Sequence, residues 1–275
     1  MVMCMSPRRC IKEAFCDLES LEQGEAREFI AEELLAPSPS AGDGWLECRL
    51  VRPTKTRYAL YGPKGFLLSA EKVGESLYVS AYEFDTPREN GERRRAAILT
   101  PSRGRGLRYR LHLCVGALVV ADAAPLVDVV PTTHRIGNSD VDVRGYAVRC
   151  SPAAAGPHYT RDVAKLVAGA PDAENHPSTA GLKLRSRLPA WDKRNGCMSL
   201  KFGRGRVRRS SSKNVLIYAE DALRGSPSPD AALFQMGKTA KGEFAVDFRA
   251  PLAPIHAFAI ALAAFDSKYA LRRGR

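Results

Sequence analysis

The chain has 275 residues, 45% of them hydrophobic, and a formal net charge of +12. This allows a sizeable core in one large domain or two smaller ones. Residues 1–41 carry four basic and eight acidic side chains, and the remainder carries 38 basic and 22 acidic ones. A body this basic indicates a polyanionic partner: nucleic acid, anionic lipid headgroups or acidic protein. Seven cysteines without a CxxC pair argue against a zinc site and a disulfide framework, and favour a reducing interior.

The N-terminal segment is acidic and favours helix. Its start, MVMCMSPRRC, lacks the apolar stretch of a signal peptide, and Val2 excludes N-myristoylation. Residues 11–35 predict helix with a break at Gly24, and 36–44 predict a flexible linker. This is either a solvated terminal helix or a docking helix for a partner protein. We therefore expect an acidic helical segment and linker over 1–41 and a separate domain over 42–275.

From Trp45 onward, the pattern changes to short strands separated by turn residues. The clearest strand is 107–115, where Tyr109 and Leu111 alternate with Arg108 and Arg110. One helix is expected at 161–168. The other strand candidates lie at 45–52, 57–61, 66–70, 77–82, 117–121, 143–149, 197–202, 214–219, 231–236 and 243–248.

The stretch 250–265 is apolar on every side and carries no formal charge. Pro251 and Pro254 suit the start of a helix, and His256 is expected to cap or pack there. The stretch is shorter than the roughly 20 residues needed to cross a bilayer. A helix that is apolar all round must be buried, and about ten or more strands precede it. We expect a closed barrel with this helix in its lumen and no membrane span.

Two arginine clusters are candidates for contact with phosphate oxygens. The alternative for the second cluster, which lies within residues 204–209, is an exposed hairpin with solvated arginines. Its Arg-Arg-Ser-Ser-Ser run is the kind of sequence that a basophilic kinase modifies, at Ser210 or Ser211. The first cluster comprises Arg93, Arg94, Arg95, Arg103 and Arg105, and the second comprises Arg204, Arg206, Arg208 and Arg209.

The sequence contains no assembled enzyme motif. Gly237-Lys238-Thr239 mimics the end of a phosphate-binding loop, but Ala232 stands where the first glycine is required. The five histidines are scattered, and no nucleophile is paired with a base. Aromatic residues are sparse near both arginine clusters, and neither an RNP signature nor a zinc-finger spacing occurs. We expect a non-enzymatic protein that needs no cofactor and holds no metal.

The C-terminal third resembles the tubby family. The similar segments, in order, are Leu188-Pro189-Ala190-Trp191, GRVRRSSSKN (205–214), FQMGKTAKGEFAVDFRAPL (234–252) and HAFAIALAAFDSK (256–268). Further back, FLLSA (66–70) and LYVS (77–80) are similar to two strands of the family, and 143–152 is weakly similar to another. The resemblance implies a barrel of about twelve antiparallel strands enclosing the C-terminal helix.

The resemblance also implies binding of phosphoinositides, chiefly phosphatidylinositol 4,5-bisphosphate. Related proteins are adaptors that bring membrane receptors to cilia, with an N-terminal helix that docks on the intraflagellar transport machinery. In this chain the lipid-binding loop is EKVGES (71–76), with Lys72 as its one basic residue, and a second family arginine falls on Thr100. Arg93–Arg95, Arg103 and Arg105 are near enough in sequence to substitute.

These observations lead to one main prediction. The chain is expected to be a phosphoinositide-binding peripheral membrane adaptor in membrane-protein or ciliary trafficking. It would act in the cytoplasm at the plasma or ciliary membrane, with the nucleus as a further location. The alternatives are a nucleic-acid-binding regulatory protein and a protein-binding scaffold that has lost the lipid site.

Overall fold

The computed structural model describes residues 44–84, 95–104, 106–115, 118–119, 125–135, 142–151, 181–194, 196–225 and 227–273. The expected N-terminal helix and linker (1–41), the expected helix at 161–168 and residues Arg93, Arg94 and Arg105 lie outside this description.

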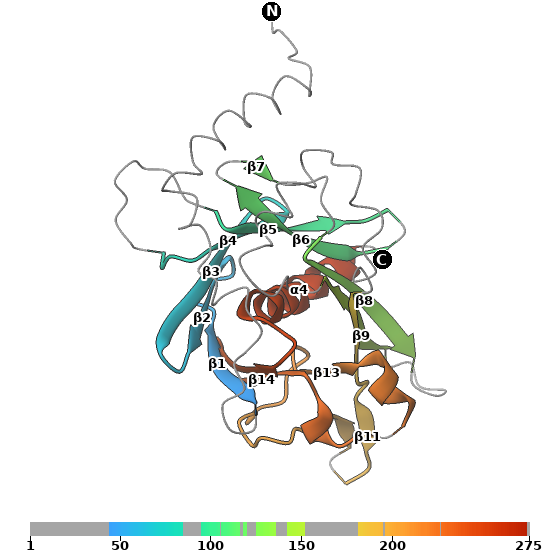
Figure 1. The fold of residues 1–275 in the computed structure, drawn as a ribbon. Helices are drawn as coiled ribbons and strands as arrows, with labels where there is room; N and C mark the ends of the chain where they lie inside the picture. Colours follow the sequence, from blue (N-terminus) through green and yellow to red (C-terminus); the bar gives the residue numbers. More distant parts are fainter. Residues whose placement is uncertain are drawn as a thin grey trace, which may run out of the picture.

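Twelve strands form a closed antiparallel barrel (Figure 1). The ring runs β5-β4-β3-β2-β1-β15-β14-β13-β10-β9-β8-β6, and pairing of β5 with β6 closes it. This confirms the expected fold class. The strands are β1 (Trp45–Val51), β2 (Arg57–Gly62), β3 (Gly65–Val73), β4 (Ser76–Ser80), β5 (Ala97–Ser102), β6 (Arg108–Val115), β8 (Val127–Arg135), β9 (Asp142–Cys150), β10 (Leu182–Ser186), β13 (Val215–Ala219), β14 (Phe234–Ala240) and β15 (Glu243–Arg249).

Smaller elements decorate the barrel. Strand β7 (Leu118–Val119) pairs with the end of β6. Strands β11 (Ala190–Asp192) and β12 (Cys197–Ser199) form a separate hairpin. Two short 3-10 helices, η3 (Glu220–Arg224) and η4 (Pro229–Ala231), lie between β13 and β14.

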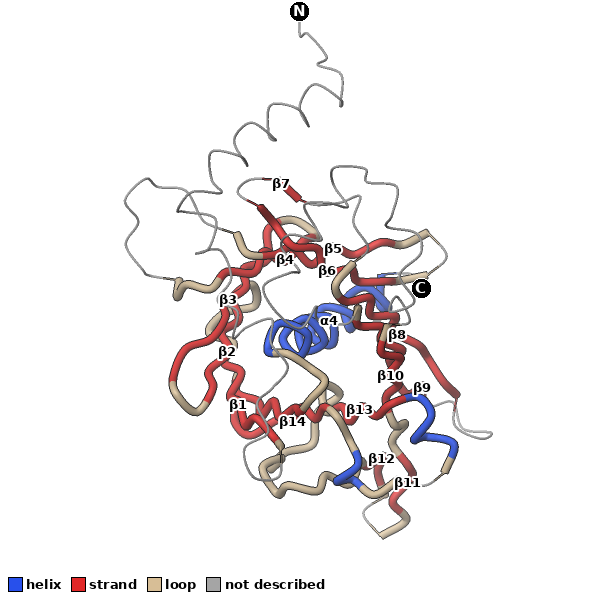
Figure 2. Tube along the Cα trace, in the orientation of Figure 1, coloured by secondary structure: helices blue, strands red, loops and turns tan. Residues whose placement is uncertain are grey.

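Helix α4 (Pro254–Arg273) fills the barrel (Figure 2). Ile255, Phe258, Leu262 and Phe265 are all 2% exposed or less, because strands surround the helix on every side. Inward residues of the strands complete the core, as in β8, where Val127 and Val129 alternate with half-buried neighbours. No helix in the described part of the chain is long and apolar enough to cross a membrane.

The helix is anchored at both ends by polar contacts. His256 is 1% exposed, and its Nδ1 accepts a hydrogen bond from Ala253 N at 3.2 Å, as expected for a residue at the helix start. Near the other end, Asp266 pairs with Lys72 and accepts from Tyr109 Oη at 2.9 Å. Lys213 Nζ donates to Ala264 O and Phe265 O at 2.7 and 2.5 Å.

The turns that follow β1, β3 and β14 lie on one rim of the barrel, because neighbouring strands run antiparallel. Helix α4 starts at the opposite rim, after β15, and runs toward this one, where Lys72 meets Asp266. The rim formed by turns 52–56, 74–75 and 241–242 is called the helix-exit rim below.

The structure contains strands that sequence patterns do not predict. Strands β5 and β8 include Pro101 and Pro131, and a proline within a run argues against a strand. Strands β10 and β11 are too short to show clear alternation. The strand expected at 231–236 begins at Phe234 and runs to Ala240, because η4 ends at Ala231. Gly237-Lys238-Thr239 therefore lies in a strand and not in a phosphate-binding loop.

Candidate anion-binding groove

Residues 203–213 form a strap across the outer wall of the barrel. The backbone N–H groups of Arg208 and Arg209 both donate to Lys238 O on β14, at 3.1 and 3.0 Å. Asn214 fixes the end of the strap, because its side chain donates to Arg209 O and accepts from Lys238 N, each at 2.9 Å. The strap is therefore bonded to the barrel wall by its own backbone.

A glycine in β14 allows the strap to lie this close. A Cβ added at Gly237 would stand 2.2 Å from Val207 Cγ2 and 2.8 Å from Val207 Cβ. No side chain fits in that space, so Val207 packs directly on the backbone of β14. The glycine that mimics a phosphate-binding loop in the sequence has this packing role in the structure.

Two arginines of the strap are used to hold it in place. Arg206 pairs with Asp247, which is fully buried on β15, and also donates to Cys48 O at 3.1 Å. Asp247 accepts a second hydrogen bond from Gln235 Nε2 at 2.6 Å, so its charge is compensated. Arg204 donates to Glu47 at 2.6 Å. These contacts orient the strap and neutralise the two cations.

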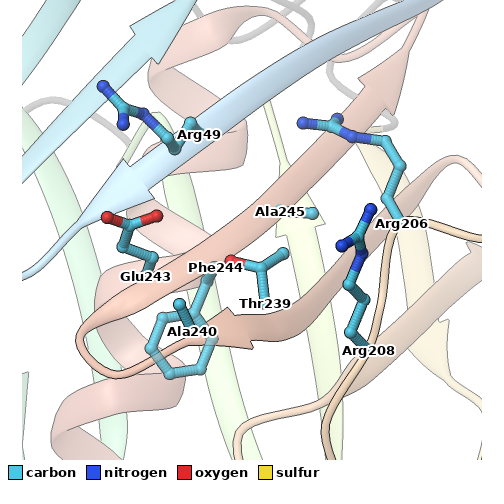
Figure 3. Close-up of a pocket in the computed structure, with 8 residues that line it drawn as sticks. All are labelled: Arg49, Arg206, Arg208, Thr239, Ala240, Glu243, Phe244 and Ala245. Carbon is cyan, nitrogen blue, oxygen red and sulfur yellow. The ribbon is translucent and has the colours of Figure 1, made fainter.

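A groove of about 350 Å³ lies between the strap and the wall formed by β1, β14 and β15 (Figure 3). Arg49 reaches its edge from β1, and Arg206 and Arg208 reach it from the strap. Glu243 is the one carboxylate among the eight lining residues. The residues lining the groove are Arg49, Arg206, Arg208, Thr239, Ala240, Glu243, Phe244 and Ala245.

Arg49 and Arg208 supply the available positive charge of this groove. Both are exposed, and neither makes an ion pair with any carboxylate in the described part of the chain. The Arg49 guanidinium lies 5.3 Å from the ring centroid of Tyr61, a cation–π contact that leaves its N–H groups free for an anion. Two such forks are suited to bidentate contact with phosphate oxygens.

The groove opens at the helix-exit rim beside further cations. Arg52 N donates to Gly242 O at 2.8 Å, which joins the β1–β2 turn to the β14–β15 turn. Lys55 and Lys241 stand on these two turns, and both are exposed without a carboxylate partner among the described residues. Arg209 is likewise exposed on the strap. Arg209 follows Arg208, Lys241 follows Ala240, and Lys55 stands on the turn joined to 241–242, so these three neighbours add basic side chains at the edge of the groove.

Lys72 and the described members of the first predicted cluster, Arg95 and Arg103, all have partners. Lys72 pairs with Asp266, and Arg103 donates to Glu75 at 2.7 Å. Arg95 stacks on the ring of Tyr78, with its guanidinium carbon 4.0 Å from the centroid. Arg103 and Lys72 lie toward the helix-exit rim, whereas Arg95 precedes β5 at the opposite rim. The structure therefore does not gather Lys72, Arg95 and Arg103 into one site.

Of the second predicted cluster, Arg208 lines the groove and Arg209 lies beside it, whereas Arg204 and Arg206 are paired. Sequence reasoning missed Arg49, Lys55 and Lys241, because none of them belongs to a run of consecutive or alternating basic residues. The outward phase of Arg49 in β1, between Cys48 and Leu50, is the signal that would have found it.

Known proteins match the second half of this chain. Residues 134–267 match the model of the Tub family. The chain is 42% identical to Tubby-related protein 2 of Mus musculus over 32% of this chain and 15% of that protein. It is 38% identical to Tubby-like F-box protein 8 of Oryza sativa subsp. japonica over 36% of this chain and 24% of that protein. Against Tubby-like F-box protein 2 of Arabidopsis thaliana, identity is 33% over 52% of this chain and 36% of that protein.

A closed barrel of twelve antiparallel strands around a hydrophobic C-terminal helix, with this match from the end of β8 to Ser267, defines a tubby-like domain. The chain is a divergent member of the tubby-like family. It spans well under two thirds of the length of the curated relatives that it matches.

Proposed function

We propose that this tubby-like protein is a non-enzymatic adaptor that binds an anionic phosphoinositide headgroup in the groove beneath its strap. The observation that carries the proposal is that Arg49 and Arg208, which make no ion pair in the described part of the chain, lie at the edge of a hollow of about 350 Å³. The hollow is comparable in volume to small-ligand sites. Thr239 adds a hydroxyl that can hydrogen-bond a phosphate or an inositol ring.

The surroundings of the groove favour a membrane over a free anion. Lys55, Lys241 and Arg209 extend the basic edge at the helix-exit rim. Each basic residue near an anionic leaflet contributes about 1 kcal/mol, so a few of them together give reversible attachment. The groove would then supply headgroup recognition, and the edge would supply general attraction.

The resemblance to the tubby family supports the finer parts of the proposal. Phosphatidylinositol 4,5-bisphosphate is the expected headgroup, and membrane-protein or ciliary trafficking is the expected process. The acidic segment 1–41 would engage a trafficking protein, such as the intraflagellar transport machinery. The protein would then act in the cytoplasm, peripherally at the plasma or ciliary membrane.

Vesicle flotation tests the proposal. The full chain is mixed with vesicles of phosphatidylcholine that contain either phosphatidylinositol 4,5-bisphosphate or phosphatidylserine at equal total charge. We expect stronger binding to the phosphoinositide, and loss of this preference in the Arg49→Gln/Arg208→Gln variant. The matched control removes two exposed lysines elsewhere, Lys64 at the opposite rim and Lys183 on β10, and should keep the preference.

Flotation together with a DNA-binding assay separates the alternatives. Binding to duplex DNA with a steep salt dependence and without any lipid preference would support the nucleic-acid-binding alternative instead. Absence of binding to every vesicle and to DNA would leave the protein-binding scaffold. Either result would overturn the proposed function.

A further inference from the structure

Three consecutive serines, Ser210–Ser212, lie in the strap next to the free arginines of the groove. We infer that Ser212 is a phosphorylation site for a basophilic serine kinase, and that its phosphate lowers the affinity of the groove for an anionic headgroup. The phosphorylation site is argued from the geometry of the strap. The loss of headgroup affinity rests on the proposed function.

The structure distinguishes the three hydroxyl groups. Ser211 is half-buried, and its Oγ accepts a hydrogen bond from Lys213 N at 3.2 Å within a turn that Asn214 N closes on Ser211 O at 3.0 Å. Ser212 stands at the outer corner of this turn, is exposed, and has no hydrogen bond from its side chain among the described residues. Its hydroxyl is therefore accessible to an enzyme, and that of Ser211 is engaged.

The charges around Ser212 fit a kinase that recognises basic residues. Arg209 stands three residues before Ser212 and Arg208 four residues before it, both exposed and without a carboxylate partner in the described structure. Ser210 is also exposed, but both arginines stand closer to it, within two residues. Ser211 and Ser212 each have an arginine three residues before them, Arg208 and Arg209 respectively. Because Ser211 is half-buried and hydrogen-bonded to Lys213 N, a kinase that contacts such an arginine would select Ser212.

The reaction is an ordinary phosphoryl transfer. The Ser212 oxygen attacks the γ-phosphorus of ATP, the new O–P bond forms as the bond to the ADP oxygen breaks, and the hydroxyl proton passes to the base of the kinase. The phosphate carries a charge of about −1.5 to −2 and strong acceptor oxygens. It would pair with Arg208 and Arg209 of its own strap, and so remove free cations from the groove and its edge.

The first test is site mapping. The full chain is incubated with a basophilic serine kinase and ATP, and the modified residue is identified by mass spectrometry. We expect incorporation at Ser212, loss of incorporation in Ser212→Ala and retention in Ser210→Ala. Incorporation that persists in Ser212→Ala, or no incorporation into a chain with an intact strap, would overturn the inference.

The second test compares vesicle binding before and after stoichiometric phosphorylation. We expect affinity for phosphoinositide vesicles to fall by about tenfold or more, because roughly two basic charges are neutralised. In the Arg208→Gln/Arg209→Gln background, where the kinase would lack its recognition residues, Ser212→Asp should lower the affinity by less than it does in the otherwise wild-type chain, since the free cations are already absent. Equal binding by both forms would overturn the regulatory role. If the unmodified chain bound no vesicle, the proposed function and this role would fall, while mapping at Ser212 would still establish the site.

Discussion

Lys72 and Arg208 are both cations near the helix-exit rim, but they have different surroundings. Lys72 pairs with Asp266 on the central helix, a residue 194 positions away in the chain. Arg208 faces an open groove and has no ion-pair partner in the described structure. The availability of a basic side chain for an external anion therefore depends on its neighbours in space and not on its place in a motif.

This contrast predicts that Lys72 stabilises the fold more than it binds lipid. Substituting Lys72→Met leaves the Asp266 carboxylate with Tyr109 as its hydrogen-bond donor in the described structure, and we expect the free energy of unfolding to fall by about 1–3 kcal/mol. Chemical denaturation measures this loss, and Lys64→Met is the control without an effect. Vesicle binding by folded Lys72→Met should equal that of the wild type; a selective loss of phosphoinositide binding would contradict this assignment.

His256 predicts a pH dependence of stability. Burial lowers its pKa from 6.5 to about 4, because the charged imidazole would lose its hydration inside the barrel. Between these values the unfolded chain binds a proton that the folded chain does not. Stability is therefore fully present above pH 6.5 and falls as the pH drops toward 4, by about 3 kcal/mol from this residue.

Denaturation measured from pH 7 to pH 4 tests this effect. In His256→Gln, the part of the slope that belongs to this imidazole should disappear. His134→Gln removes an exposed histidine and should keep the wild-type slope. Identical slopes in wild type and His256→Gln would show that the residue does not titrate as its burial requires.

At the scale of elements, the strap depends on one close backbone contact. An alanine at position 237 would place its Cβ against Val207, including the branching atom of that side chain. We expect Gly237→Ala to push the strap outward, to cost about 1–3 kcal/mol of stability, and to weaken headgroup binding by moving Arg208. Hydrogen exchange of the Arg208 and Arg209 amides, which donate to Lys238 O, should increase. Unchanged exchange at both amides would contradict this account of the strap.

The helix and the barrel were predictable from sequence for a physical reason. A charge-free helix with apolar residues on all sides must be enclosed, and many short strands upstream provide the only enclosure. Individual strands were harder to predict. Pro101 lies within β5 and Pro131 within β8, and a proline within a run of residues argues against a strand there. Of the two strands whose pairing closes the barrel, β6 was therefore predicted and β5 was not.

The groove could be predicted only in part, because charge neutralisation is a long-range property. The run 204–209 indicated a basic surface, and Arg208 and Arg209 are indeed free of carboxylate partners in the described structure. The partners Glu47 and Asp247, which neutralise Arg204 and Arg206, come from other strands. Arg49 joins the groove only through the pairing of β1 with β15, which no local pattern reveals.

At the scale of the whole molecule, the groove and its basic neighbours lie at one rim of the barrel. The central helix and the ring of strands form a rigid scaffold, and the free cations of the groove lie with Lys55 and Lys241 along one edge of it. The family match covers the second half of the chain, but β1 contributes Arg49 from the first half. Both halves are therefore needed to build the groove.

Calorimetric titration of the full chain with soluble inositol 1,4,5-trisphosphate tests the central claim most directly, because it removes general attraction to a membrane surface. We expect saturable binding of one headgroup. The affinity should fall by about tenfold or more in Arg49→Gln and in Arg208→Gln, and should be unchanged in Lys64→Gln. Equal affinity in the wild type and in both arginine variants, or no heat of binding, would show that the groove beneath the strap is not the headgroup site.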